Sequence, residues 1–270
     1  NSALNAFADL LAEAGHPMPH RFALRPNTGI ATGLDMDGDG RTGTPDDAQG
    51  FGRFAGAGGM AILSRHPVDT SAVVDHSGFL WRDLPEAMIP RRDGSAFPSD
   101  AVFAIQRLSS TGHWQVPVVL PDGRRLTLLA WHAGPPVFGG PLSRNQRRNH
   151  DETAFWYHLL NGSLPLPPPA EAFVLIGNSN LDPTSGDGLH TAMQTLLSHP
   201  ALQDPQPLGR RPGATADSPA TAWWPNGPGA MRVSYILPDA SARVLDSGLI
   251  WPGEPARHAL VWVDLLPQGP

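Results

Sequence analysis

The stretch that most constrains the fold is Phe173 to Pro183, which reads FVLIGNSNLDP. Four apolar residues run into Gly177, and a short polar turn follows. A buried strand delivers side chains to the carboxyl edge of a sheet in this way, and α/β proteins bind their ligands at that edge. Because the turn carries Asn178, Asn180 and Asp182, we expect the functional site to lie there.

Composition narrows the chemistry that such a site can use. The chain has 270 residues and a formal net charge of -6, and all 19 basic residues are arginine. The mild acidic excess argues against a protein that coats nucleic acid, although a local basic cleft stays open. Cysteine is absent, which excludes disulfides, thiolate zinc sites and thiol catalysis. No apolar run approaches the roughly 18 residues of a membrane span.

Hydrophobic periodicity predicts more strands than helices. The pattern favours a single α+β domain over residues 1–270, with two sheets packed face to face and helices outside them. Residues 121–123, Pro-Asp-Gly, predict a hairpin turn. Helices are expected at 2–13, 151–160 and 191–202. Strands are expected at 21–24, 60–63, 114–120, 125–131, from 173, and at 232–237, 243–249 and 258–265, and residues 204–230 are expected to form a loop.

An acidic loop follows the first predicted strand. Asp35, Asp37 and Asp39 alternate with other residues, and Gly40 permits a sharp bend after them. Alternating carboxylates direct their oxygens to one side of a turn, and hard oxygen ligands at this spacing suit Ca²⁺. A solvated acidic turn is the other reading, but three carboxylates this close repel one another unless a cation lies between them. The expected ligands of a structural calcium site are Asp35, Asp37, Asp39, Arg41, Asp46 and Asp47.

Two further motifs are ambiguous when taken alone. His132 ends a predicted strand before the rigid loop Ala-Gly-Pro-Pro-Val-Phe, where it is placed either to meet a ligand or to serve as an ordinary loop histidine. The segment 144–152 reads RNQRRNHDE. It is typical of a helix start with Asn149 as the N-cap and two acids in the first turn, and its arginines could instead grip an anion.

Together and in this order, these motifs resemble the endonuclease/exonuclease/phosphatase superfamily, which includes pancreatic-type deoxyribonucleases, abasic-site endonucleases and sphingomyelinases. They are most similar to a bacterial branch with an Asp-rich loop, a His-x-x-Pro-Pro-Val-Phe loop, an Arg-Asn-His-Asp-Glu helix start and a Ser-Asp-His ending. The resemblance implies a four-layered α/β sandwich of two mainly antiparallel sheets flanked by helices, and metal-dependent phosphoester hydrolysis. The corresponding segments here are 34–47, 132–138, 148–152 and 256–258.

The resemblance also implies roles for single residues. In such enzymes a divalent cation (Mg²⁺ or Mn²⁺) polarises the phosphate, a Gly-Asp-x-Asn turn positions water, and two histidines stabilise the charged oxygens. His132, Asn180 and His258 match this pattern. We therefore predict a catalytic set of His132, Asn178, Asn180 and His258, with Arg148 and Asn149 as substrate-binding residues.

The departures from the family pattern concern its acids. Asn178 stands where the turn has Asp, and an amide cannot accept a proton. Ser234 replaces a second Asp in Arg-Val-Asp-Tyr, and Ala256-Arg257 replaces Ser-Asp, so that a cation adjoins His258. The first strands of the family, with an Asn and a metal-holding Glu, would lie upstream of the first residue, so we expect this domain to lack them.

The lost acids predict a non-catalytic binding or assembly subunit that retains the fold, because losing a general base alone costs about 10² to 10⁴ in rate. The alternative is an active nuclease, phosphodiesterase or phosphatase with a rebuilt site. We expect a phosphate-containing ligand, and upstream residues or a protein partner that complete the N-terminal sheet. A periplasmic or extracellular location is expected, because calcium sites of modest affinity need millimolar calcium.

Overall fold

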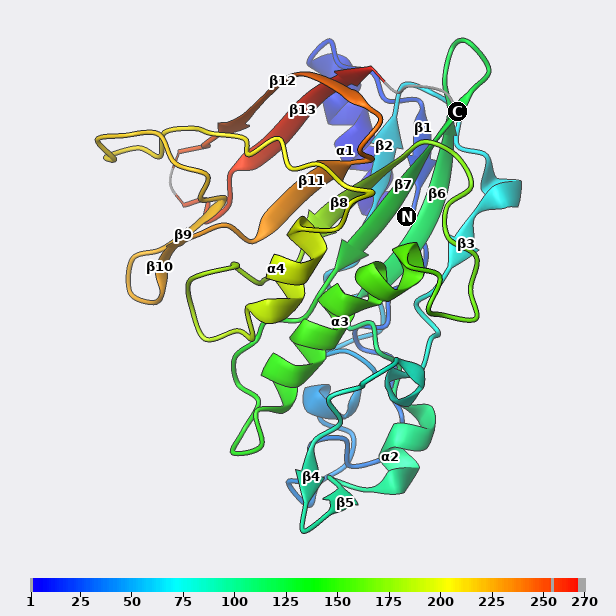
Figure 1. Cartoon of the computed structure of the whole chain (residues 1–270), viewed down its shortest axis with the longest axis vertical. Helices are drawn as coiled ribbons and strands as arrows, with labels where there is room; N and C mark the ends of the chain where they lie inside the picture. The colour runs from blue at the N-terminus through cyan, green and yellow to red at the C-terminus, as the bar shows by residue number, and fades with distance from the viewer. Residues whose placement is uncertain (1, 254, 267–270) are drawn as a thin grey trace.

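A five-stranded sheet of order β11-β8-β7-β6-β3 lies at the centre of the computed structural model, which describes residues 2–253 and 255–266 (Figure 1). β7 and β8 are parallel, and the other neighbours are antiparallel. A parallel pair needs a crossover connection, which α3 supplies here. The carboxyl ends of β7 and β8 therefore meet at one edge. The strands are β3 (Val74–Asp75), β6 (Gly112–Val119), β7 (Arg125–His132), β8 (Phe173–Asn178) and β11 (Ser234–Pro238).

Two helices, α3 (Arg144–Leu160) and α4 (Thr191–Leu197), cover one face of this sheet. Leu129 and Leu175 point from the sheet into the same core as Phe155 of α3, and all three are almost fully buried. Burying a side chain of this size contributes roughly 1.5–3 kcal/mol. The sheet is therefore firmly attached to α3, the helix that carries part of the candidate site.

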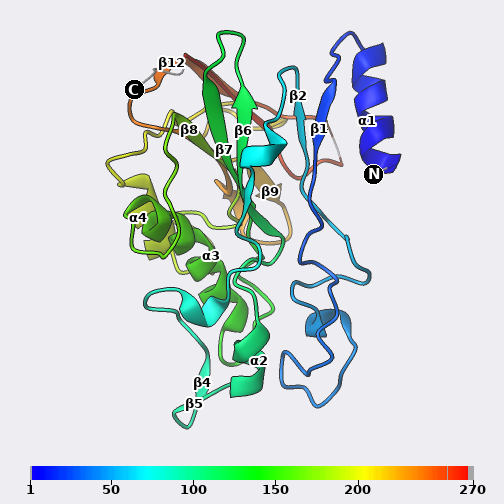
Figure 2. The ribbon, with the colours of Figure 1, turned by 90° about the vertical axis from the view of Figure 1, so that its right-hand side faces the viewer.

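The opposite face packs against a short antiparallel pair, β1 (His20–Phe22) with β2 (Ile62–Ser64). Phe22 meets Trp114 edge to face at 5.7 Å between ring centroids. α1 (Ser2–Glu13) lies outside this pair, so Figure 2 shows α3 with α4, the central sheet, β1–β2 and α1 in succession. This order confirms the expected four-layered arrangement.

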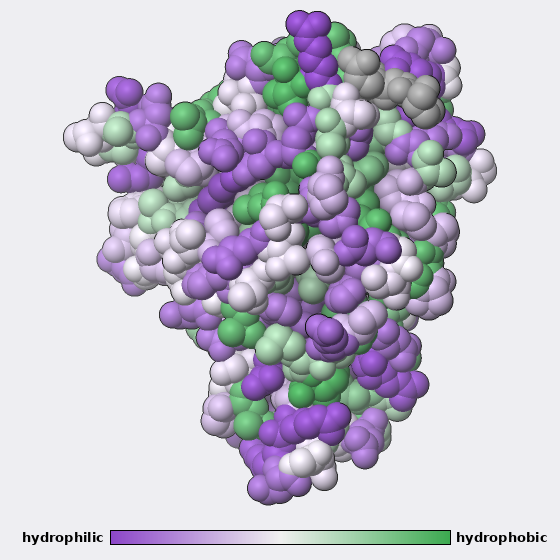
Figure 3. Space-filling model, viewed as in Figure 1, coloured by the Kyte–Doolittle hydropathy of each residue, from purple (hydrophilic) through white to green (hydrophobic). Residues whose placement is uncertain are grey.

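The remaining elements surround these layers. The β12–β13 pair contacts β11, and the surface on the side of α3 and α4 is mostly hydrophilic, with small separated hydrophobic patches (Figure 3). Among the described residues, no helix has the length and hydrophobicity needed to cross a membrane. The other elements are α2 (Asp100–Ile105), β4 (Arg91–Arg92), β5 (Ser95–Ala96), β9 (Ala222–Trp224), β10 (Gly229–Met231), β12 (Arg243–Ile250), β13 (Leu260–Leu266) and the 3-10 helices Pro45–Asp47, Thr70–Ala72 and Trp81–Asp83.

The start of α3 corrects one prediction from the sequence. The helix begins at Arg144, seven residues earlier than expected, and follows Ser143 in a left-handed conformation with a φ of 53°. Asn149 is therefore buried inside the helix and is not its N-cap, and Glu152 does not lie in the first turn. The segment 204–230 also differs from the prediction, because β9 and most of β10 lie within it.

Candidate functional site

Three polar side chains lie side by side, in register, on neighbouring strands. In the ladder, His132 of β7 is the register partner of Asn178 of β8, and Asn178 is the partner of Ser234 of β11. Register partners project from the same face of a sheet. An imidazole, an amide and a hydroxyl therefore form one row at the sheet edge. Of the predicted catalytic set, His132 and Asn178 thus lie side by side, and their role in catalysis stays a prediction.

The turn after β8 is held by its own side chains. Asn178 Oδ1 accepts a hydrogen bond from the backbone N–H of Asn180 at 3.2 Å, and Asn180 Nδ2 donates to the carbonyl of Ala133 at 2.8 Å. Asn180 has a φ of 52°, a conformation that Asn tolerates better than most residues. Gly177 is required before the turn, because an added Cβ would lie 2.0 Å from the Trp131 carbonyl oxygen. The turn thus fixes both amides beside His132.

His132 contacts the neighbouring amide of Asn178. Its Nε2 lies 3.3 Å from Asn178 Nδ2, which is also 3.2 Å from Asn180 Oδ1. Burial lowers the pKa of His132, and the nearby His258 lowers it further. His132 is therefore neutral at pH 7. His258 itself lies on the exposed segment before β13, where its ring meets Trp224 edge to face at 5.5 Å.

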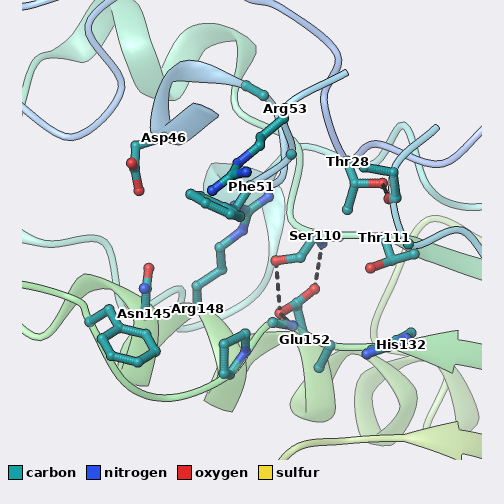
Figure 4. Close-up of a pocket in the computed structure, with 18 of the residues that line it drawn as sticks. Thr28, Asp46, Phe51, Arg53, Ser110, Thr111, His132, Asn145, Arg148 and Glu152 are labelled. Carbon is teal, nitrogen blue, oxygen red and sulfur yellow. Dashed lines mark hydrogen bonds between the residues drawn. The ribbon is translucent and has the colours of Figure 1, made fainter. Parts of the chain in front are cut away.

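A cavity of about 770 Å³ opens beside His132. Its walls come from the loop after the acidic segment, from residues 110–111 just before β6, from the loop after β7 and from α3. In the view of Figure 4, Glu152 lies between His132 on one side and Phe51 with Arg148 on the other. The charged lining residues are three arginines, Arg53, Arg144 and Arg148, and two acids, Asp46 and Glu152.

Arg148 and Glu152 lie on one face of α3, and both side chains form hydrogen bonds to the backbone of neighbouring loops. Arg148 is buried, and its guanidinium donates to the carbonyls of residues 49, 107, 108 and 109 at 2.6–3.2 Å. Glu152 accepts from the backbone N–H of Ser110 at 2.5 Å and of Gly134 at 2.8 Å. The two side chains therefore hold the loops on either side of His132.

Glu152 is the residue that the sequence interpretation missed. Burial raises the pKa of its carboxyl to about 7, although Arg148 and the two backbone donors oppose this shift. Burial likewise lowers the pKa of Arg148 to about 10. The usable signal was the i, i+4 spacing of Arg148 and Glu152, which places both on one face of a helix that begins at Arg144.

Asn149 supports the same loops from the next position of α3. Its Nδ2 donates to the carbonyls of Gly134 and Ser179, each at 2.7 Å, and the side chain is fully buried. The described contacts of Arg148 and Asn149 are thus to the backbone of the site's loops. A direct role of these two residues in substrate binding stays a prediction.

The acidic loop brings three of the expected ligands together. One carboxylate oxygen each from Asp35, Asp37 and Asp39 lies within 4.8 Å of the others. Burial and the neighbouring acids raise the pKa of Asp37, as expected for crowded carboxylates that a cation would relieve. Asp47 lies apart from them, because its oxygens accept from Met36 N and Thr44 N, each at 2.8 Å. Asp46 and Arg41 are exposed.

Comparison with known proteins gives a family and a fold. The profile described as Endonuclease/Exonuclease/phosphatase family matches residues 4–262. A search of curated proteins gives no match. An endonuclease/exonuclease/phosphatase from Beutenbergia cavernae superposes with a TM-score of 0.54 at 16% identity, covering 98% of this chain. The chain spans 57% of the length of that protein. At this identity the likeness concerns the fold alone.

Two other solved structures are more distant. A family protein from Leptotrichia buccalis has a TM-score of 0.46 and 14% identity, covering 97% of this chain and 77% of its own. Sphingomyelinase C from Streptomyces griseocarneus has a TM-score of 0.43 and 15% identity, and the match covers 95% of this chain and 78% of that protein.

Proposed function

The chain belongs to the endonuclease/exonuclease/phosphatase family. On that premise we propose that it binds phosphate esters at the carboxyl ends of β7 and β8 and the start of β11, without hydrolysing them at an enzymatic rate. The observation that carries this proposal is the row of His132, Asn178 and Ser234. An imidazole, an amide and a hydroxyl donate hydrogen bonds to phosphate oxygens. None of them is a carboxylate that could hold a metal ion and take a proton from water.

The binding step follows from these donors. Asn178 Nδ2 points between His132 and Asn180. A phosphate oxygen that replaced the contact between Asn178 and His132 would accept from Asn178 Nδ2 and, in the tautomer with the proton on Nε2, from His132. A phosphate oxygen placed among these atoms would receive hydrogen bonds without displacing a counterion. Arg257 precedes His258 in the chain and is exposed.

An active hydrolase is the second candidate, and one observation favours it. Glu152 lines the same cavity as His132, and a carboxyl with a pKa of about 7 can take or give a proton near neutral pH. Against it, both oxygens already accept backbone hydrogen bonds. We therefore give Glu152 a positioning role in the proposal.

The metal site of the proposal is the acidic loop. Asp35, Asp37 and Asp39 fit a hard cation, because their oxygens converge and Asp37 is crowded by like charges. Bound Ca²⁺ would supply local charge neutralisation and rigidity. Mg²⁺ or Mn²⁺ would be needed only for catalysis. The proposal includes a location outside the cytosol. A calcium site of modest affinity is filled only where calcium is abundant.

Phosphorus NMR of phenyl phosphate mixed with the protein tests binding and hydrolysis together. We expect the ester signal to broaden or shift while no inorganic phosphate signal grows, with calcium or magnesium present. His132→Gln should abolish the broadening, and His16→Gln, at an exposed position near α1, should not. An unchanged ester signal contradicts binding, and a growing phosphate signal that depends on the protein contradicts the absence of catalysis.

A further inference from the structure

The cavity beside His132 is larger than a phosphate group requires. Its volume of about 770 Å³ falls within the range of roughly 300–1,000 Å³ typical of sites for whole small molecules. His132 lines one part of it, and residues of α3, of the 46–58 loop and of the loop after β7 line most of the rest. If a phosphoryl group binds at His132, the remaining space accommodates the organic part of the same molecule.

Arg144 lines this space and carries hydrogen-bond donors without a partner among the described residues. Its Nε and Nη2 atoms are buried and have no hydrogen-bond partner among the described residues. A buried polar group without a partner is unfavourable, and a buried charge more so. Burial lowers the pKa of Arg144, while the charges of Asp37, Asp46 and Asp47 oppose that change. A planar guanidinium with free donors matches a carboxylate or phosphate group.

Three phenylalanines line the same cavity from two separate loops. Phe51 and Phe54 are 64% and 68% exposed, and Phe138 is 92% exposed. Phe138 also has a φ of 64°, a conformation that is rare for a bulky residue and is retained mainly at functional sites. Single exposed apolar side chains need no explanation, but three rings around one cavity provide an apolar, π-rich lining for a flat group.

We propose that this cavity is a specificity subsite for the organic group of the phosphate ester, and that it selects a flat, preferably aromatic group carrying a second anionic substituent. Phe51, Phe54 and Phe138 pack against the flat group, and Arg144 pairs with the anion. This inference rests on the proposed binding of phosphate esters at His132. A long acyl chain fits less well, because it would leave the donors of Arg144 buried and unpaired.

Calorimetric titration with three phosphonates, which cannot be hydrolysed as esters, tests the subsite separately from activity. The probes are methylphosphonate, phenylphosphonate and 4-carboxyphenylphosphonate in calcium-containing buffer. We expect affinity to rise in that order, with at least about a tenfold gain from the carboxylate, as for a charge-assisted hydrogen bond. Arg144→Gln should remove the carboxylate gain and leave phenylphosphonate binding unchanged. Arg147→Gln, at the next arginine of α3 and outside the cavity lining, is the matched control.

Phe138→Ala provides a second variant, because so exposed a side chain contributes little to folding. It should weaken both aryl probes several-fold and leave methylphosphonate unchanged. If the aryl probes bind no better than methylphosphonate, or if the carboxylate gain survives Arg144→Gln, the subsite is wrong while phosphate binding stands. If none of the three probes binds, the proposed function fails and the subsite fails with it.

Discussion

The acidic loop and the strand-end row use opposite chemistries within one molecule. In the loop, Asp35, Asp37 and Asp39 bring three carboxylates within 4.8 Å of one another. In the row, the positions where the family resemblance implies acids carry Asn178 and Ser234, beside a neutral His132. Crowded carboxylates call for a cation, whereas neutral donors call for an anion. The loop is therefore suited to binding a cation, and the row is suited to binding a phosphate group.

Restoring acids to the row should have the largest effect. Asn178→Asp, Ser234→Asp and Arg257→Asp together reintroduce a general base, a second carboxylate and an anionic partner for His258. We expect metal-dependent hydrolysis of bis-p-nitrophenyl phosphate by the full chain to rise by about 10² to 10⁴, the usual contribution of general base catalysis. Adding His132→Gln to the triple variant should abolish the gain. A folded triple variant with unchanged rates would show that the acids are not what the row lacks.

Removing an acid from the loop should have the next largest effect. Calcium at one hundred times its dissociation constant should stabilise the protein by about 2.7 kcal/mol, seen as a higher unfolding temperature. Asp35→Asn should abolish this response, because Asp35 belongs to the cluster and accepts from Gly38 N at 2.7 Å and Gly40 N at 2.8 Å. Asp122→Asn, in the exposed β6–β7 turn, is the control. A calcium response that persists in Asp35→Asn would place the ion elsewhere.

Glu152, the buried acid beside the row, gives a smaller and pH-dependent effect. Its folded pKa of about 7 exceeds the ordinary 4.5 because burial disfavours the charge. The folded state therefore holds an extra proton between pH 4.5 and 7, and the contribution of Glu152 to stability falls as pH rises through that window. Urea unfolding at several pH values should show this fall in the wild type, relative to Glu152→Gln. Parallel pH profiles for the two proteins would contradict it.

The smallest expected effect is a coupling between the two regions. Asp37 and Asp46 act electrostatically on Arg144. A cation bound in the loop would neutralise part of their charge, so Arg144 would attract an anion in the cavity more strongly. We expect calcium to tighten binding of 4-carboxyphenylphosphonate a few-fold at low salt, and the ligand to tighten calcium by the same factor. Arg144→Gln should remove the coupling. Equal affinities with and without calcium would mean that the two sites are independent.

Much of the fold was predictable because local patterns agreed with it. The helix Ser2–Glu13 and the hairpin of β6 and β7 were predicted from periodicity and from the turn at residues 121–123. The start of α3 was not, because Asn149 followed by two acids imitates a capping signal. In the folded protein Asn149 instead donates to the carbonyls of Gly134 and Ser179, contacts that depend on distant parts of the chain.

The site was predictable in its strand-end residues and not in its cavity. A strand that runs into Gly-Asn-Ser-Asn indicates which edge carries polar groups. The family resemblance put His132 and Asn178 in one set, and the parallel pairing of β7 with β8 brings them together. The free donors of Arg144 and the exposure of Phe138 follow from how two loops pack against α3. Such packing leaves no periodic signal in the sequence.

The most direct test of the account is turnover of bis-p-nitrophenyl phosphate by the wild-type protein, with magnesium, manganese and calcium added in turn. We expect no metal-dependent turnover from protein that calcium measurably stabilises against heat. Clear metal-dependent turnover that disappears on His258→Ala would contradict it, and would mean that the row catalyses hydrolysis without the acids at Asn178 and Ser234.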